Sequence, residues 1–182
     1  YLLKNGSNVI IFDKNKRTDC ETVQVDVTNY SELKSSIGKY DFNSIIHLIS
    51  KSNISKTEND FIDSYEANIT SLKNVIHCSR DLNIKLIYTS SAAIYGIQNI
   101  PMREDHDPHP INLYGLFKYF CEELVKKECV KYGIVYTILR LFNIYNDKEN
   151  DQMIINKLHY AKESNIKLKL HGIYQLRDFI YI

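Results

Sequence analysis

KLIYTSSAAIYG, at residues 85–96, and LYGLFKYF, at residues 113–120, are the two stretches that decide how this chain folds. The first is rich in apolar, β-branched and aromatic residues, which is typical of a buried strand, and it contains a serine pair. The second opens a segment that reads as a helix from residue 113 to residue 132. A loop that carries Gly96 and three prolines lies between them. This order predicts a strand, a loop and a helix.

Tyr114 and Lys118 stand four residues apart in the second stretch, so they share one face of the expected helix. A nearby ammonium favours the phenolate and lowers the pKa of a tyrosine from about 10. Such a tyrosine can exchange a proton with a substrate hydroxyl, while a serine hydroxyl holds that oxygen. Tyr30 and Lys34 repeat the spacing, and the spacing alone is more typical of a solvated helix face. The serine-bearing strand upstream is what distinguishes Tyr114.

The rest of the chain alternates strand-like and helix-like segments. Residues 2–5 resemble a last helical turn, with Gly6 as its C-cap. We expect an α/β fold with a doubly wound parallel sheet, because strands and helices of these lengths alternate in βαβ units. The expected strands are 8–12, 22–26, 44–49, 85–89 and 134–139, and the expected helices are 30–37, 60–82, 113–132 and 152–163, the last followed by the segment 166–170.

Composition excludes several classes of function. The formal net charge is +1, from 23 basic and 22 acidic residues, and the basic residues are scattered, so we expect no nucleic-acid partner. We expect no membrane partner, because no apolar run is long enough to span a bilayer. The four cysteines form no CxxC pair and indicate reduced thiols in a cytoplasmic protein.

Polar residues follow several expected strands, where parallel sheets bind ligands. Asp13 could accept hydrogen bonds from an adenosine ribose, or could be an ordinary turn residue. Asp26 and Val27 end the second strand, where the carboxylate could meet an adenine or could cap the next helix. Asn68 lies in ANIT, a stretch of poor helix propensity, which suggests another task. His47 sits in an apolar strand, and we expect it to pack there.

The order of motifs along the chain resembles that of a known protein family. It resembles the extended branch of the short-chain dehydrogenase/reductases, and within it the NAD-dependent epimerase/dehydratase family of nucleotide-sugar enzymes. The resemblance covers almost all 182 residues and rests on an ordered series: VIIFD, VDVTN, IIHLIS, YEANITSLKNVI, IYTSSAAIYG, EDHDPHPINLYGLFK, ILRLFNIYN and QLRDFIYI.

The resemblance implies a Rossmann-like fold, NAD as cofactor, a nucleotide-sugar substrate, a homodimer and no metal. It implies one incomplete domain, with the nucleotide-binding core in 1–150 and the start of the substrate-binding part in 151–182. The implied homodimer pairs through the two long helices, 60–82 and 113–132. The implied catalytic residues are Ser91, Tyr114 and Lys118. The implied dinucleotide site comprises Asp13, Asp26, Val27, Leu48, Ile49, Asn68, Lys118 and Phe142. The implied substrate site comprises Ser91, Tyr114, Asn143 and Arg177.

Departures from the family pattern qualify this reading, and one of them is Tyr145-Asn146 in place of a common Tyr-Gly turn. The family's first strand and glycine-rich GxxGxxG turn have no counterpart among the six glycines, so we expect them upstream of Tyr1. HLIS replaces the usual HLAA or HLAG, so Ile49 would crowd the cofactor. We expect most of the substrate lobe to lie beyond Ile182, which makes the chain a fragment.

The serine segment helps to choose the subclass. Sugar dehydratases of the family carry Asp-Glu after the threonine or serine, whereas this chain has Ala92 and Ala93. The resemblance therefore favours a nucleotide-sugar epimerase over a dehydratase. A nucleotide-4-keto-sugar reductase and a non-catalytic dinucleotide-binding remnant are the alternatives.

Overall fold

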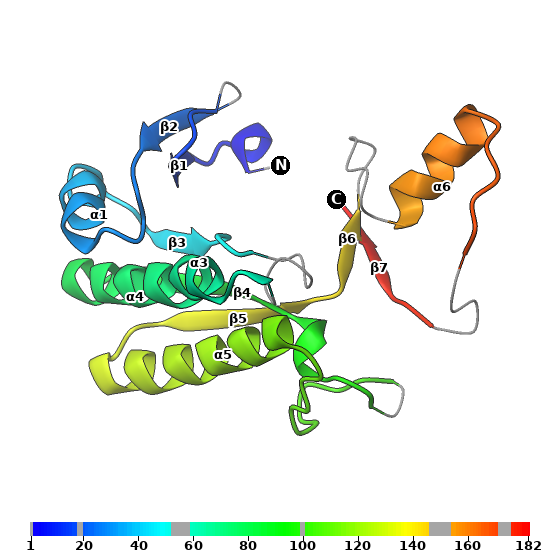
Figure 1. The fold of residues 1–182 in the computed structure, drawn as a ribbon. Coiled ribbons are helices and arrows are strands. Elements are labelled where there is room, and N and C mark those ends of the chain that lie inside the picture. Colours follow the sequence, from blue (N-terminus) through cyan, green and yellow to red (C-terminus); the bar gives the residue numbers. More distant parts are fainter. Residues whose placement is uncertain (1, 18–19, 52–58, 99–100, 146–153, 171–175) are drawn as a thin grey trace. The chain divides into compact units, whose positions relative to one another are not determined.

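The computed structural model describes residues 2–17, 20–51, 59–98, 101–145, 154–170 and 176–182 (Figure 1). The chain separates into two compact units, Tyr1–Arg140 and Leu141–Ile182, and each is described by itself. The expected assignment of roles to residues 1–150 and 151–182 stays a prediction.

The first unit contains two groups of hydrogen-bonded strands. β1 (Ile10–Asp13) pairs in parallel with β2 (Glu21–Gln24). β3 (Ser44–His47), β4 (Lys85–Ser91) and β5 (Tyr136–Leu141) form a sheet in the order β3-β4-β5, in which β3 and β4 run parallel. Among the described residues, β1 has β2 as its one strand neighbour and β3 has β4.

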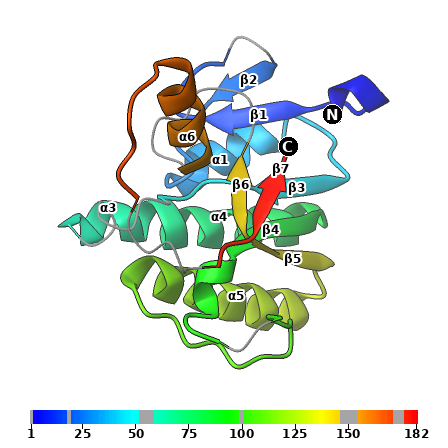
Figure 2. The same cartoon turned by 90° about the vertical axis from the view of Figure 1, so that its right-hand side faces the viewer.

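Helices connect and cover these strands (Figures 1 and 2). α1 spans Tyr30–Ile37 and α5 spans Leu113–Tyr132, both with the predicted bounds. Their first turns are capped by Asn29 and Asn112, whose side-chain oxygens accept from the amides of Glu32 and Gly115. Short 3₁₀ turns occur at Leu3–Asn5 and Ala92–Ile94, and the first of them ends on Gly6 at φ 80°, as predicted.

The expected helix 60–82 consists of three consecutive segments. α3 (Phe61–Tyr65) and α4 (Ser71–Leu82) flank a π-helical segment, η2 (Glu66–Thr70). Two side chains bond to carbonyls one turn back, from Asn68 to Ser64 and from Ser71 to Ala67. Such side-chain bonds compete with the backbone ladder, and single π turns are common at functional sites. ANIT, whose residues have poor helix propensity, therefore lies where the helix changes from α to π.

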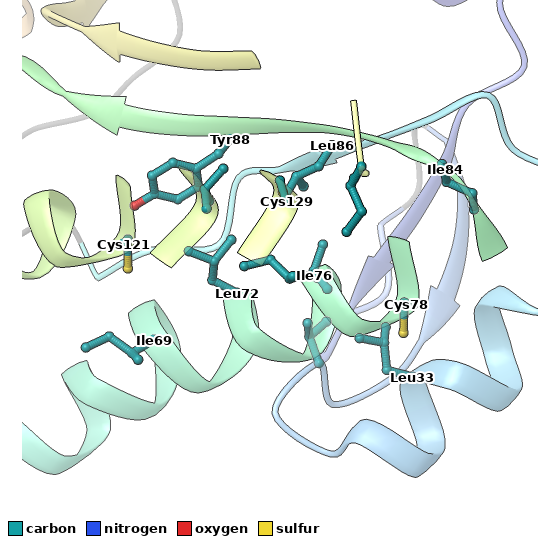
Figure 3. Close-up of a cluster of buried hydrophobic side chains, with 14 of the residues drawn as sticks. Leu33, Ile69, Leu72, Ile76, Cys78, Ile84, Leu86, Tyr88, Cys121 and Cys129 are labelled. Atoms are coloured by element: carbon teal, nitrogen blue, oxygen red, sulfur yellow. The ribbon is translucent and has the colours of Figure 1, made fainter. Parts of the chain in front are cut away.

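The core lies where α4 and α5 pack against each other and against β4. Figure 3 shows its side chains arriving from α1, the long helices and β4. Along α5, positions four residues apart are buried, which is the stripe that a helix presents to a core. That stripe consists of Phe117, Cys121, Val125 and Cys129, and from α4 it meets Leu72, Val75 and Ile76.

The second unit is small. β6 (Asn143–Tyr145) and β7 (Phe179–Tyr181) pair in parallel, and α6 spans Ile154–Glu163. The two strands were missed because three-residue strands have too little periodicity to be seen before pairing. Residues 152 and 153 of the expected helix lie outside the described ranges, and 166–170 form no regular element.

Candidate active site

Tyr114 lies in the first turn of α5, next to the end of β4. The helix begins there because the Asn112 side chain accepts from the Gly115 amide at 2.8 Å. A Cβ on Gly115 would lie 2.7 Å from the carbonyl oxygen of Ala93. Glycine at this position therefore lets the first turn of α5 approach the backbone that follows Ser91, which brings the tyrosine to the serine-bearing strand.

Ser91 is the last residue of β4, and interaction with its side chain lowers the pKa of the Tyr114 phenol. The Ser91 Oγ accepts from the backbone amide of Ala93 at 3.2 Å. Because this bond occupies an acceptor position, the Ser91 hydroxyl hydrogen is available to the phenol oxygen. The predicted serine and tyrosine are thus brought together.

Lys118 lies one turn further along α5 and is 3% exposed. Its ammonium donates to the Thr89 carbonyl at 2.8 Å and lies 5.1 Å from the ring centroid of Tyr88 and 5.9 Å from that of Tyr114. Burial lowers the pKa of Lys118 to about 8. The three predicted catalytic residues therefore lie in one place.

The pKa of Tyr114 differs from the expectation. Burial raises the Tyr114 pKa above its ordinary value, and hydrogen bonding with Ser91 and Ser50 opposes this only in part. The expected lowering by Lys118 was wrong for this structure. The reason is that burial of the phenol is the largest influence on its pKa and favours the neutral form.

Ser50 is a site residue that the sequence reasoning missed. It follows β3, its side chain donates to the Asn68 Oδ1 at 2.7 Å, and its interaction with Tyr114 lowers the pKa of that phenol. The available signal was the final serine of HLIS, a polar residue where the family pattern has alanine or glycine. Asn68 is 2% exposed, and its amide is engaged by Ser50 and by the Ser64 carbonyl.

The other expected dinucleotide residues of the first unit lie at the carboxyl ends of strands. Asp13 ends β1 and Asp26 follows β2, as parallel pairing requires. Leu48 and Ile49 follow β3; the Leu48 side chain is 69% exposed and Ile49 packs against the core. Val27 is buried beside Asp26.

The two carboxylates are held by local bonds. Asp13 accepts from the Asn15 amide at 2.9 Å and lies 3.8 Å from the Arg17 guanidinium. Burial raises the pKa of Asp26, but hydrogen bonds from Thr28 and the Lys14 ammonium outweigh it, so the pKa is lowered. Asp26 does not cap the next helix, because Asn29 does.

His47 packs as expected. It is 3% exposed, its Nε2 lies 3.0 Å from the Ser71 hydroxyl, and burial together with the Lys118 charge lowers its pKa to about 3. A neutral imidazole at this depth fills the space between β3 and α4.

The remaining expected residues belong to the second unit. Phe142 precedes β6, and Asn143 begins it with its side-chain amide donating to the Asp178 carbonyl at 3.1 Å. Arg177 precedes β7 and donates to the Leu176 carbonyl. Because β6 and β7 run parallel from Asn143 and Phe179, Asn143 and Arg177 lie at the same end of this strand pair.

The described ranges contain neither a metal-binding cluster nor a membrane-spanning helix. No group of three or more His, Cys, Asp or Glu side chains there is arranged to hold a metal ion. No described helix is both long enough and apolar enough to cross a bilayer. Of the cysteines, Cys78, Cys121 and Cys129 are buried and unpaired, and Cys20 is partly buried and unpaired.

Parallel strands with covering helices, and a serine, a tyrosine and a lysine gathered at the end of one strand, define the class of Rossmann-like short-chain dehydrogenase/reductases. The chain belongs to the NAD dependent epimerase/dehydratase family, whose family model matches residues 1–182. The expected recognition, fold class and NAD cofactor of the family are thereby confirmed.

The chain is similar in sequence to individual proteins of known name. The chain is 29% identical over 164 residues to a UDP-glucuronate 4-epimerase of Thermodesulfobacterium geofontis, covering 87% of this chain and 50% of the relative. It is 29% identical over 189 residues to a GDP-6-deoxy-D-talose 4-dehydrogenase of Aggregatibacter actinomycetemcomitans, covering 97% of this chain and 62% of the relative.

Among solved structures, the chain is similar to a UDP-glucuronic acid 4-epimerase of Bacillus cereus in complex with UDP-glucuronic acid and NAD. The TM-score is 0.86 at 22% identity, covering 99% of this chain and 63% of that one. At this identity the likeness concerns the fold. The chain therefore spans between half and two thirds of the length of these relatives.

Proposed function

We propose that the protein to which this chain belongs is an NAD-dependent nucleotide-sugar epimerase. One observation carries the proposal: the buried Lys118 ammonium lies 5.9 Å from the ring centroid of Tyr114, and interaction with the Ser91 side chain lowers the pKa of the same phenol. A donor, a titratable hydroxyl and a cation in one place are what proton exchange with a sugar hydroxyl needs. Family membership supports the same chemistry.

The site residues act in sequence on one carbon of the sugar. Tyr114, in its phenolate form, takes the proton from the sugar hydroxyl, and Ser91 donates to the same oxygen as it becomes a carbonyl. NAD, when bound, supplies the acceptor for the hydride that leaves this carbon. Return of hydride and proton to the other face regenerates an alcohol of opposite configuration, so the reaction has no net oxidation.

The strand ends fit a dinucleotide. The side chain of Asp13 at the end of β1 is 30% exposed, so its carboxylate is accessible to a ribose. We propose that the rest of the cofactor is lined by Asp26, Val27, Leu48, Ile49, Asn68 and Lys118, with Phe142 from the second unit. Asn143 and Arg177 are proposed to hold the substrate diphosphate, for which a guanidinium is well shaped.

Replacement of Tyr114 by phenylalanine tests the proposal. We expect turnover of the nucleotide sugar to fall about 10²–10⁴-fold while NAD binding is retained, because one general acid/base is removed. Tyr30→Phe is the matched control, since Tyr30 has the same spacing to Lys34 but bonds Asp81. Equal turnover in wild type and Tyr114→Phe would contradict the assignment.

A nucleotide-4-keto-sugar reductase is the second candidate, because one relative named above is a 4-dehydrogenase. The two differ in stoichiometry: an epimerase interconverts two sugars with no net change in dinucleotide, whereas a reductase consumes one reduced dinucleotide per product. Absorbance of the reduced cofactor during turnover separates them. A non-catalytic dinucleotide-binding protein would bind NAD with no turnover in either assay.

The exposed apolar side chains of α3 and α5 support a homodimer. On the two long helices that were expected to pair, Leu72, Val75, Ile76 and Phe117 are buried in the core. The apolar side chains exposed on these helices are Phe61, Ile62, Tyr65, Leu116 and Phe120. We propose that this set forms the dimer seam. Phe120→Glu should give a monomer in light scattering, and a dimer unchanged by Phe120→Glu would contradict it.

A further inference from the structure

The Lys118 ammonium is buried without an ion-pair partner among the described residues. The side chain is 3% exposed, and its one hydrogen bond within the described ranges goes to the Thr89 carbonyl at 2.8 Å. Glu122 lies one turn further along α5, but both of its carboxylate oxygens accept from the Arg140 guanidinium. An ammonium has three donors and loses water on burial, so another group must offset part of the cost of its charge.

Two aromatic rings face this ammonium. The Lys118 Nζ lies 5.1 Å from the ring centroid of Tyr88 on β4 and 5.9 Å from that of Tyr114 on α5. The negative face of a ring attracts a cation at such distances, and more strongly where water is excluded. Tyr88 is 1% exposed, and its hydroxyl makes no hydrogen bond of ordinary geometry to the described residues. The ring is therefore the part of Tyr88 that acts on Lys118.

His47 packs against the Tyr88 ring and helps to fix its orientation. The two ring centroids are 5.8 Å apart, and the rings are tilted by 41°. The His47 Nε2 lies 3.0 Å from the Ser71 hydroxyl, which itself donates to the Ala67 carbonyl at 2.6 Å. Because the Ser71 hydrogen is committed to that carbonyl, the imidazole is the donor of its own bond to Ser71. The bond anchors the imidazole to α4, so the neighbouring Tyr88 ring has a fixed wall.

We propose that Tyr88 is a positioning residue of this site, whose ring face holds the Lys118 ammonium beside Tyr114. The inference rests on the proposed role of Lys118 in the site. The ring attracts the ammonium and not the neutral amine, so it stabilises the charged form that burial opposes. The Thr89 carbonyl and the Tyr88 ring together define where the charge lies.

Other titratable and charged groups face Lys118 from α5, β4 and β3. They are Tyr114, Cys121 and Glu122 on α5, Tyr88 on β4 and His47 on β3. Burial raises the pKa of Cys121 to about 11 and, together with the Lys118 charge, lowers that of His47 to about 3. Burial also raises the pKa of both tyrosines above the ordinary value. Burial lowers the pKa of Lys118 to about 8, so these four groups titrate outside its range.

The test is an NMR titration of protein with ¹³Cε-labelled lysine, in which the Lys118 signal is identified by its loss in Lys118→Met. Tyr88→Phe keeps the ring face, so the pKa of Lys118 should stay close to that of the wild type. Tyr88→pentafluorophenylalanine nearly keeps the size of the ring but reverses its charge distribution, so the pKa should fall by about one unit. The same fluorinated residue in place of Phe117 is the matched control, because Phe117 is a buried ring of α5 that contacts Phe61.

The outcomes separate the ring face from mere packing. A fall with the fluorinated ring at position 88, and none with Tyr88→Phe or with the control, supports the inference. An unchanged pKa with the fluorinated ring, or an equal fall in Tyr88→Phe or in the control, overturns it. If the pentafluorinated variant does not fold, a difluorophenylalanine at the same position should give a smaller fall of the same sign. The titration needs neither substrate nor NAD, so a protein without epimerase turnover would refute the proposed function and leave this result standing.

Discussion

The guanidinium of Arg140 donates to both carboxylate oxygens of Glu122, with Nε 3.0 Å from Oε1 and Nη2 2.9 Å from Oε2. Its remaining nitrogen donates to the Tyr95 hydroxyl and the Glu104 carbonyl. One side chain therefore connects the end of β5 to α5 and to the loop before it. Because α5 carries Tyr114 and Lys118, this connection helps to hold in place the helix on which the proposed site is built.

Breaking this pair should be costly. The Glu122 side chain is 1% exposed and that of Arg140 is 15% exposed, so Glu122→Leu leaves a mostly buried guanidinium without its partner. We expect a loss of about 3–5 kcal/mol in the free energy of unfolding. The double variant Glu122→Leu/Arg140→Met should recover much of it, as measured by urea denaturation.

The exposed pair Arg103–Asp105 provides the control. Its side chains are 68% and 67% exposed, so solvent screens the pair and Asp105→Asn should leave the free energy of unfolding nearly unchanged. Similar losses at the two sites would contradict the argument that burial decides the cost.

Gly96 is expected to tolerate no side chain. It has φ +63°, and a Cβ there would lie 1.8 Å from the backbone oxygen of His109. Gly96→Ala should cost at least about 2 kcal/mol from strain and collision together. Gly133→Ala isolates the strain, since Gly133 has φ +68° with no atom within 4 Å, and it should cost only about 1–2 kcal/mol. Thermal denaturation of both variants checks the order.

Burial of Lys118 predicts a pH dependence of stability. Its pKa falls from 10.5 in the unfolded chain to about 8 in the folded one, so between these values the unfolded chain binds the extra proton. The cost of burying the ammonium is therefore present below pH 8 and disappears as the pH rises to 10.5. Relative to Lys118→Met, the wild type should gain roughly 3 kcal/mol over this range.

Denaturation of wild type and Lys118→Met at several pH values measures this difference. Titrating groups remote from Lys118 are common to both proteins and cancel, so the remaining difference belongs to Lys118 and to Cys121, whose pKa the Lys118 charge lowers. A difference that stays constant with pH would show that the Lys118 ammonium is as well solvated when folded as when unfolded.

Asp13 should make the complete protein prefer NAD to NADP, because its carboxylate repels a 2′-phosphate. The nearby cations Arg17 and Lys14 are paired with Asp13 and Asp26, which limits their help to a phosphate. Asp13→Asn should reduce the preference by about tenfold, or 1.4 kcal/mol. Titration calorimetry with both dinucleotides checks this, with Lys16→Gln as the control; tighter NADP binding by the wild type would contradict it.

Much of the fold was predictable because its signals are local. The bounds of α1 and α5 follow from asparagine caps and helical periodicity, and both were predicted correctly. The strands β1 and β2 were displaced by one or two residues at their ends, since pairing determines where a strand stops. The π-helical segment at Asn68 and the strands β6 and β7 depend on contacts that no local pattern contains.

The sequence by itself determined the family, the parallel α/β class and the identity of Ser91, Tyr114 and Lys118 as the proposed proton-exchanging group, because residue types and order along the chain carry this information. Only the tertiary structure decided the burial of these groups, their neighbours and the direction in which the pKa of Tyr114 is shifted. Burial, and not the lysine four residues away, dominates the pKa of Tyr114, and Ser50 reaches Asn68 from the segment that follows β3. Desolvation and hydrogen-bond direction are properties of the packed neighbourhood, and they arise only once distant segments meet.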